Sequence, residues 1–421
     1  MLRVAVLSVH TCPLAPLGGW ETGGMNVYVR ELSRELGKLG VATDVFTRRQ
    51  DPDVPTVVEL GEHARVVHVD AGPPRHMDKY EVVDYLSEFA CNLQRFRNFV
   101  GARYDLIHAH YWLSGRLATL FQEHWRVPVV AMFHTLAQMK NRVAVDASEL
   151  EQQIRVDIER RTMATADRVI AATDVDRAQM LMAYGANPRT VTVVPGGVNL
   201  GLFRPGSRRQ ARRALGFGDE RVLLFVGRIQ RLKGIDLLLR AAAELADDPA
   251  GLRIVIVGGI SQGAHGRVSE EERESARLHA LAAELGLERL TDFVGPVPHE
   301  RLPLFYRAAD VTVMPSTYES FGLVAVESLA CGTPVVASRV GGLPTIVRAG
   351  ENGFLIPWRH PRLFADKIRA VLTDPTLRRR LRRNGLATAQ HFGWSAVAER
   401  TLDVYDTVLS RRASTRALLV E

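Results

Sequence analysis

Cysteine and long apolar runs are both scarce in this chain of 421 residues. The three cysteines, Cys12, Cys91 and Cys331, lie far apart and form no CxxC pair. This spacing argues against a disulfide framework or a zinc site, and it favours a reducing, cytoplasmic setting. No run approaches the ~18 apolar residues of a membrane-spanning helix, and the apolar start of the chain is too short for a secretory leader. Neither a membrane-spanning helix nor a secretory leader is therefore expected.

Lysine is also scarce, although Lys and Arg together number 54. Only five lysines are present: Lys38, Lys79, Lys140, Lys233 and Lys367. The formal net charge of +7 is mild for this length and the basic residues are scattered, so we do not expect nucleic acid as a partner. The one dense basic run, 378–383, is predicted to be a solvated helix face, with a membrane-surface or partner patch as the alternative.

Short Val/Ile-rich runs alternate with helical patterns, which predicts an α/β protein with parallel strands covered by helices. The alternation breaks at a Pro/Gly-rich linker, residues 195–206, and then restarts. We therefore expect two doubly wound, Rossmann-like domains, 1–197 and 198–394. Such sheets bind ligands at the carboxyl ends of their strands, and two facing sheets would place the site in the cleft between domains. Strands are expected at 3–9, 42–47, 66–69, 105–110, 127–134, 168–173, 190–194, 221–227, 252–259, 290–295, 310–315 and 333–338.

The glycine-rich motif GGWETGGMNVYV, residues 18–29, places four glycines after the first expected strand and before a helix expected at 25–40. Gly23 and Gly24 would let the backbone approach a ligand closely and leave N–H groups free to bind an anion at the helix N-terminus. The spacing is not GxGxxG, so the loop is no dinucleotide fingerprint. A flexible loop with no ligand remains the alternative.

A second motif, FVGRIQRLKGID, places Arg228 and Lys233 after the end of a strand. A guanidinium and an ammonium at that position suit a diphosphate, because the first binds in a bidentate way and the second acts as a point charge. The alternative is a solvated basic turn.

The third motif, PSTYESFGLVAVESLACG, is the most specific. The N–H groups of Phe321, Gly322 and Leu323 would point at an anion from the start of a helix. Glu319 is suited to accept hydrogen bonds from hydroxyls. Glu327 lies on an otherwise apolar helix face and needs partners, which ribose hydroxyls would supply. Alternatively, Glu319 caps the helix and Glu327 makes a structural ion pair.

Together these motifs resemble the retaining nucleotide-sugar glycosyltransferases of family 4, which have the GT-B fold, over the chain up to about residue 400. The resemblance implies that Glu319 holds hydroxyls of the donor sugar and Glu327, eight positions on, holds the nucleotide ribose. It implies that Arg228 and Lys233 clamp the diphosphate. It also implies a C-terminal helix, 395–421, that crosses back to the N-terminal domain.

The same resemblance assigns further donor contacts. Gly23 and Gly24 match a glycine loop that meets the diphosphate from the other domain, and Val297 matches the segment whose backbone reads the base. His134, at the end of an expected strand, matches a histidine beside the reacting sugar. A lone histidine at such a place is as often structural.

Within the family, the segments SVHTCPL, HTLAQMKN and ESFGLVAVE are most similar to inositol-phosphate glycosyltransferases and next to sucrose-phosphate synthases, and both use phosphorylated acceptors. The resemblance implies a UDP-sugar donor carrying glucose or N-acetylglucosamine and a small phosphorylated polyol or sugar as the acceptor. No cofactor, metal site or essential divalent cation is expected. A cytoplasmic enzyme is expected, with a homodimer and a monomer both left open. The implied acceptor residues are His10 and Asn26 near the ring and Lys79, Tyr111, Thr135 and Arg155 on the phosphate.

Other functions remain open at this stage. A transferase of the same fold would use fructose 6-phosphate, or a lipid or glycan at a membrane. A UDP-sugar epimerase would need no acceptor, and a nucleotide-sugar sensor would bind without turnover. A phosphorylase is disfavoured because it needs a lysine for pyridoxal phosphate, and three of the five lysines lie in or beside the motifs above.

Overall fold

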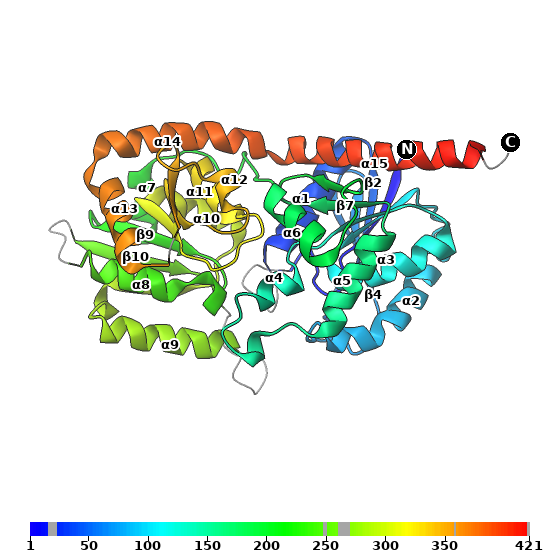
Figure 1. The fold of residues 1–421 in the computed structure, drawn as a ribbon, viewed down its shortest axis with the longest axis horizontal. Coiled ribbons are helices and arrows are strands. Elements are labelled where there is room, and N and C mark those ends of the chain that lie inside the picture. Colours follow the sequence, from blue (N-terminus) through cyan, green and yellow to red (C-terminus); the bar gives the residue numbers. More distant parts are fainter. Residues whose placement is uncertain (16–22, 247–250, 260–269, 358, 419–421) are drawn as a thin grey trace. The chain divides into compact units, whose positions relative to one another are not determined.

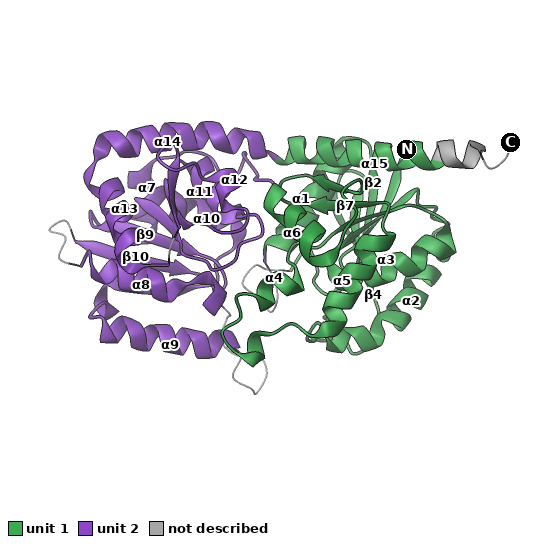
Figure 2. Cartoon of the chain, in the orientation of Figure 1, with its two compact units in different colours: residues 1–15, 24–195, 394–421 green, residues 16–23, 196–393 purple. Residues whose placement is uncertain are grey.

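The computed structural model describes residues 1–15, 23–246, 251–259, 270–357 and 359–418 (Figure 1). The chain divides into two compact units, coloured separately in Figure 2. Unit 1 comprises Met1–Ala15, Gly24–Pro195 and Trp394–Glu421, and unit 2 comprises Pro16–Gly23 and Gly196–Gly393. Each unit is built around one sheet.

The sheet of unit 1 has eight strands in the order β3-β4-β2-β1-β5-β6-β7-β8. Its central strands are Val- and Ile-rich and buried on both faces, as parallel strands covered by helices must be. The edge strand β3 runs antiparallel to β4 and was not predicted, because its residues are mostly exposed and carry Glu and Gly. The strands are β1 (Arg3–Leu7), β2 (Ala42–Arg48), β3 (Val57–Gly61), β4 (Ala64–Val69), β5 (Leu106–His110), β6 (Val129–Met132), β7 (Arg168–Ala171) and β8 (Val191–Val193).

Seven α-helices belong to the described part of unit 1, and they include the C-terminal helix α15, which packs against α1. Local signals explain some of the ends. The side chain of Thr173 accepts a hydrogen bond from the N–H of Asp176 and so caps α6, and Gly185 ends that helix with φ of 70°. The helices are α1 (Gly24–Lys38), α2 (Leu86–Phe99), α3 (Tyr111–Trp125), α4 (Ala137–Asn141), α5 (Gln153–Thr165), α6 (Asp174–Tyr184) and α15 (Trp394–Leu418), with 3-10 turns η1 (Glu81–Tyr85) and η2 (Ala147–Glu149).

The sheet of unit 2 has six parallel strands in the order β11-β10-β9-β12-β13-β14. The five expected strands are present, and β14 is an additional edge strand whose four residues are too few for a clear pattern. The strands are β9 (Arg221–Val226), β10 (Leu252–Val257), β11 (Thr291–Gly295), β12 (Val311–Met314), β13 (Val335–Ser338) and β14 (Gly353–Ile356).

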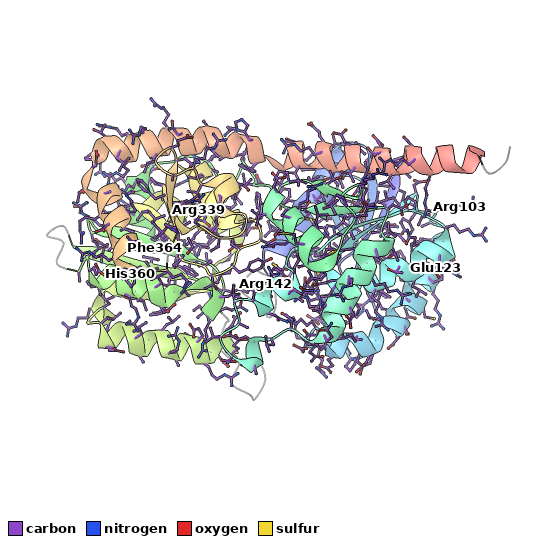
Figure 3. All side chains as sticks on the ribbon, viewed as in Figure 1. Arg103, Glu123, Arg142, Arg339, His360 and Phe364 are labelled. Carbon is purple, nitrogen blue, oxygen red and sulfur yellow. The ribbon has the colours of Figure 1, made fainter. Side chains whose placement is uncertain are left out.

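Helices cover this second sheet, and α8 packs against both α9 and α13. Phe225, Leu238 and Phe364 are buried in the core of the unit, whereas charged side chains of unit 1 such as Arg103 and Glu123 lie at the surface (Figure 3). The helices are α7 (Arg208–Leu215), α8 (Ile235–Ala243), α9 (Glu270–Glu284), α10 (Leu302–Ala308), α11 (Leu323–Cys331), α12 (Leu343–Ile346), α13 (Pro361–Thr373) and α14 (Pro375–Ala389), with 3-10 turns η3 (Arg231–Lys233), η4 (Glu288–Leu290), η5 (His299–Arg301) and η6 (Gln390–Phe392).

Each sheet has one point at which the strand order reverses. In unit 1 the chain proceeds from β1 to β2 on one side and resumes at β5 on the other. In unit 2 it proceeds from β9 to β10 and β11, and resumes at β12 on the other side of β9. The loops after the two strands diverge at such a point and leave room for a ligand. The site is therefore expected after β1 and β5, and after β9 and β12.

The basic run in α14 is only partly the solvated face that the sequence predicted. Arg378 reaches the buried Asp310, with 3.3 Å between Nη1 and Oδ1, and the same carboxylate also pairs with Arg208 and Arg212. The other four arginines of the run are exposed: Arg379, Arg380, Arg382 and Arg383. Within the described residues, every helix is too short or too polar to span a bilayer.

Candidate active site

The loops after β9 and β12 bring together two of the predicted donor residues in unit 2. Lys233 ends the short turn η3, and its Nζ lies 2.6 Å from Oε2 of Glu319. The two loops are also joined through the backbone, since the N–H of Thr317 donates to the carbonyl of Leu232 at 2.8 Å. Arg228 lies in the same loop as Lys233, directly after β9, and is half-buried.

Glycines allow these loops to approach one another. Gly234 has φ of 68°, and a Cβ on it would lie 2.2 Å from the carbonyl oxygen of Pro315. Gly341 has φ of 48°, and a Cβ there would lie 1.7 Å from the carbonyl oxygen of Glu319. The N–H of Gly342 donates to that same carbonyl at 2.9 Å. Any larger residue at Gly234 or Gly341 would displace the loop that holds the Lys233–Glu319 pair.

The predicted anion-binding helix begins where the sequence placed it. Leu323 is the first residue of α11, and Gly322 precedes it with φ of 106°. The first N–H groups of a helix have no carbonyl partner inside the helix, so this end can bind an anion. Phe321 is buried and packs edge-on against Phe392, with ring centroids 5.7 Å apart. Val297 is half-buried, two residues beyond the end of β11.

Glu327 is buried on α11, and the protein itself supplies partners for its carboxylate. Oε1 lies 2.9 Å from Nε2 of His299, and Oε2 accepts a hydrogen bond from the hydroxyl of Tyr306 at 2.8 Å. Burial and the neighbouring carboxylate raise the pKa of Tyr306, so its hydroxyl stays protonated and can donate. Each carboxylate oxygen can accept a further hydrogen bond, so these contacts leave capacity for a ligand hydroxyl.

In unit 1, His10 follows β1 and Tyr111 follows β5, at the reversal of strand order. Their rings stack with centroids 4.5 Å apart. Asn26 is buried in the first turn of α1 and donates from Nδ2 to the carbonyl of Cys12 at 2.7 Å. Gly24 begins α1 and Gly23 directly precedes it, while residues 18–22 of the glycine-rich motif lie outside the described residues.

The four residues assigned to the acceptor phosphate come together in unit 1. Arg155 donates from Nη2 to the carbonyl and the hydroxyl of Thr135 at 2.9 and 3.0 Å, and its guanidinium lies 4.8 Å from the ring centroid of Tyr111. Arg155 and Lys79 meet at Glu151, which sequence reasoning did not single out. Lys79 approaches Oε1 of this carboxylate at 2.8 Å and Arg155 approaches it at 3.0 Å.

Lys140 also belongs to this cluster, although no role was expected for it from the sequence. Its Nζ also pairs with Oε1 of Glu151. Burial by itself would raise the pKa of the Glu151 carboxyl, but Arg155, Lys79 and Lys140 together hold it below its usual range. Burial and the nearby Lys79 lower the pKa of Lys140. The cluster is thus a set of cations gathered around one ionised carboxylate.

His134 and Tyr111 both have strained backbones. Among the described residues four non-glycine residues have φ in the left-handed region, and two of them are Tyr111 at 77° and His134 at 61°. Such strain is stored where surrounding structure enforces it, often at functional sites. Nε2 of His134 lies 2.9 Å from Nδ1 of His110, so one ring donates to the other. Burial lowers the pKa of His134 to about 3, which keeps its imidazole neutral.

Several contacts of the site could not be read from local patterns. Glu151 offered one signal, since Glu151 and Arg155 have the i,i+4 spacing of a helical ion pair. His299 and Tyr306 precede Glu327 by 28 and 21 positions, and only the fold brings them to it. Within the described ranges, no group of three or more His, Cys, Asp or Glu could hold a metal ion.

Comparison with known proteins gives concordant matches over both units. The family described as Glycosyltransferase Family 4 matches residues 22–202, and the one described as Glycosyl transferases group 1 matches residues 207–388. D-inositol 3-phosphate glycosyltransferase from Thermobispora bispora is 44% identical over 415 residues, which cover 97% of this chain and 95% of the relative.

Two solved structures extend the comparison. Sucrose-phosphate synthase from Thermosynechococcus elongatus has a TM-score of 0.89 and 34% identity, covering 98% of this chain and all of the other. HepE from Anabaena, solved in complex with UDP-glucose, has a TM-score of 0.74 and 20% identity, covering 97% of this chain and all of the other. The expected GT-B fold is confirmed by these likenesses together with the two α/β sheets.

Proposed function

From the premise that the chain belongs to glycosyltransferase family 4, we propose that it moves a hexosyl group from a UDP-sugar to a hydroxyl of a small phosphorylated polyol such as an inositol phosphate. The observation that carries the acceptor class is the meeting of Lys79, Thr135 and Arg155 in unit 1. A buried guanidinium and ammonium groups at one place suit a phosphate, which offers several oxygens and more than one negative charge.

The donor is assigned to unit 2. Arg228, Lys233 and the first N–H groups of α11 would stabilise the diphosphate as it leaves, in the manner of an oxyanion hole. Glu319 would then exchange its bond with Lys233 for hydroxyls of the donor sugar. UDP as the nucleotide of the donor is supported by the solved complex of the Anabaena relative with UDP-glucose. Because cations of the chain meet the developing charge, we propose that a divalent cation is not essential.

We propose that transfer proceeds with retention. The bond between the anomeric carbon and the diphosphate oxygen breaks, and the acceptor oxygen bonds to that carbon on the same face. The acceptor proton passes to the leaving phosphate oxygen. Neutral His134 would hold the reacting sugar by a hydrogen bond, since burial keeps its pKa low. We place the reaction in the cytoplasm, in keeping with the free thiols of Cys12, Cys91 and Cys331.

A second candidate is transfer to fructose 6-phosphate, as the name of the sucrose-phosphate synthase relative suggests. The phosphate cluster fits both acceptors equally, because both carry a phosphomonoester. The groups that read the rest of the acceptor, His10 and Asn26, would have to distinguish a six-carbon ring of hydroxyls from a ketose.

An acceptor screen tests the proposal. UDP-glucose and UDP-N-acetylglucosamine are each incubated with inositol 1-phosphate, inositol 3-phosphate, fructose 6-phosphate and the two dephosphorylated compounds, inositol and fructose. We expect transfer to an inositol phosphate, and a loss of at least about a hundredfold in kcat/KM without the phosphate, because two charge-assisted contacts would be missing. Equal rates with and without the phosphate would reject the acceptor assignment. Conversion of UDP-N-acetylglucosamine without any acceptor would indicate an epimerase.

A further inference from the structure

One oxygen of Glu151 meets three cationic groups at once. Lys79 and Arg155 approach Oε1 at 2.8 and 3.0 Å, and Lys140 pairs with the same atom. Only 2% of the Glu151 side chain is exposed, and the Arg155 side chain is fully buried. Three cationic groups share one carboxylate oxygen and one negative charge, so none of them has an anionic oxygen of its own.

The carboxylate is held in this place by its own environment. Oε2 of Glu151 accepts a hydrogen bond from the hydroxyl of Tyr80 at 2.6 Å. The backbone N–H of Glu151 donates to Oδ1 of Asn141 at 2.7 Å, two residues before α5 begins at Gln153. The backbone is thus fixed, while the side chain extends from a non-helical residue into the cation cluster.

Glu159 balances the opposite side of Arg155. Its carboxylate pairs with Nε of Arg155 at 2.7 Å and accepts from the N–H of Ala137 at 3.0 Å and from the hydroxyl of Tyr184. Counting Glu159 with Glu151, three positive charges face two negative ones, so the cluster carries a net charge of +1. Glu151 is therefore the anion whose departure would free Lys79, Lys140 and one edge of Arg155.

We propose that Glu151 is a built-in counter-ion that occupies the acceptor-phosphate site of the empty enzyme and is displaced by a phosphate dianion, with Lys140 becoming a phosphate contact. This inference rests on the proposed function, since it assigns the same cluster to the acceptor. It explains why a carboxylate stands among the phosphate ligands. A phosphomonoester has three terminal oxygens and about two charges at neutral pH, so it can give each cation an oxygen of its own. A singly charged anion offers no more charge than Glu151 and would not displace it.

The test measures binding of inorganic phosphate to the full-length chain by calorimetry, without a donor. Glu151→Gln removes the competing charge and keeps the shape of the side chain. We therefore expect phosphate to bind about tenfold tighter than to the wild type, which corresponds to about 1.4 kcal/mol of competition from the carboxylate. Asp157→Asn is the matched control, because it removes one negative charge from an exposed pair on α5, six residues beyond Glu151. It should leave phosphate binding unchanged. Lys140→Ala should weaken binding about tenfold.

A folded Glu151→Gln variant that binds phosphate no tighter than the wild type would overturn the proposal, since Glu151 would then serve to orient the cations. If that variant does not fold, Tyr80→Phe provides a second test. It keeps every charge of the cluster and loosens Oε2 of Glu151, so phosphate should bind severalfold tighter, and unchanged or weaker binding would reject the proposal.

The two proposals fail in different ways. If Glu151→Gln binds phosphate more tightly but the enzyme transfers sugar to no phosphorylated acceptor, the proposed function is rejected and the counter-ion role of Glu151 is supported. If the enzyme transfers sugar to inositol phosphate but Glu151→Gln binds phosphate no more tightly than the wild type, only the counter-ion role is rejected.

Discussion

Four of the five lysines pair with carboxylates in the described structure, and the exposure of each pair distinguishes a surface lysine from a lysine of the site. Lys38 pairs with Glu35 on α1 and is largely exposed, with 62% of its side chain accessible. Lys233 pairs with Glu319 while only 20% and 17% of the two side chains are exposed. An exposed pair contributes little to stability, whereas a partly buried pair at the end of a strand is available to a ligand.

Two arginines lie in the interior of the protein. Arg48 and Arg155 are completely buried. Arg48 donates to the carbonyl oxygens of Pro73, at 2.9 Å, and of Arg75, so it holds the segment that leads to Lys79. Arg155 is buried among carboxylates in the acceptor cluster. Part of the arginine surplus thus builds the site.

Replacing Lys233 with Ala should lower kcat/KM for transfer from a UDP-sugar by tenfold to a hundredfold, because roughly 1.5–3 kcal/mol of charge-assisted stabilisation of the diphosphate is lost. Steady-state kinetics with the preferred acceptor measure the effect. Lys38→Ala removes a lysine from the exposed pair on α1 and should leave kcat/KM unchanged. Near wild-type turnover of Lys233→Ala would remove this lysine from the diphosphate clamp.

Turns between strands and helices decide where the donor residues lie. Gly234, Gly322 and Gly341 all have positive φ, and each has another part of unit 2 within about 3 Å of where a Cβ would be. These three turns surround the Lys233–Glu319 pair and the start of α11. Their glycines are required both for backbone conformation and for space.

Gly341→Ala should therefore impair donor binding more than stability alone explains. The new Cβ would lie 1.7 Å from the carbonyl oxygen of Glu319, so the Glu319 loop must move. We expect the affinity for UDP-glucose, measured by calorimetry, to fall at least about tenfold, since one displaced charge-assisted contact to the donor sugar is worth about 1.5 kcal/mol or more.

Gly350→Ala is the matched control for this change. Gly350 has φ of 79° and nothing within 4 Å of its Cβ position, so the substitution introduces the backbone strain without the collision. It should lower the free energy of unfolding by about 1 kcal/mol and leave the affinity for UDP-glucose unchanged. An equal loss of UDP-glucose affinity in both variants would show that strain, and not the collision, is responsible.

At the scale of the whole molecule, the C-terminal helix belongs to unit 1, although it follows unit 2 in the sequence. Tyr405 of α15 forms a hydrogen bond of 2.7 Å with Nδ1 of His108 on β5. His108 in turn packs against His110, with ring centroids 4.1 Å apart. A buried group of histidines therefore links the central sheet, His134 and the end of the chain.

This group should make the protein sensitive to acid. Burial, and for His108 also the neighbouring His134, lowers the pKa of His108 and of His134 from 6.5 to about 3. Below pH 6.5 the unfolded chain takes up protons that the folded chain excludes, so stability is present above this pH and is lost as the pH falls. Each histidine should remove about 1.4 kcal/mol from the free energy of unfolding per pH unit.

Urea unfolding at about pH 7.5 and about pH 5.5 measures this loss. In His108→Gln one buried titrating group is gone, so the difference between the two pH values should shrink by about 1.4 kcal/mol. The exposed His391 serves as a control, and His391→Gln should show the wild-type difference. A wild-type stability that does not change between these pH values would contradict the assignment of neutral, buried histidines.

Most elements could be predicted because their signals are local. Each signal spans only a short stretch of chain: a Val-rich run, a glycine, or the cations and glutamates that follow β9 and β12. The two α/β sheets and the start of α11 could therefore be predicted from them. The edge strands β3 and β14 did not, because exposed or very short strands carry no clear alternation of apolar and polar residues.

The amino-acid sequence thus specified the family, the two parallel sheets and the residue types at the strand ends, all of which depend on neighbours in the chain. The folded structure alone established that Lys79, Lys140 and Arg155 share Glu151, and that His299 and Tyr306 bind Glu327. Lys79 lies 72 positions from Glu151, and His299 and Tyr306 lie 28 and 21 positions from Glu327. These contacts exist only because the strand order and the packing of helices on each sheet bring those segments to the same place.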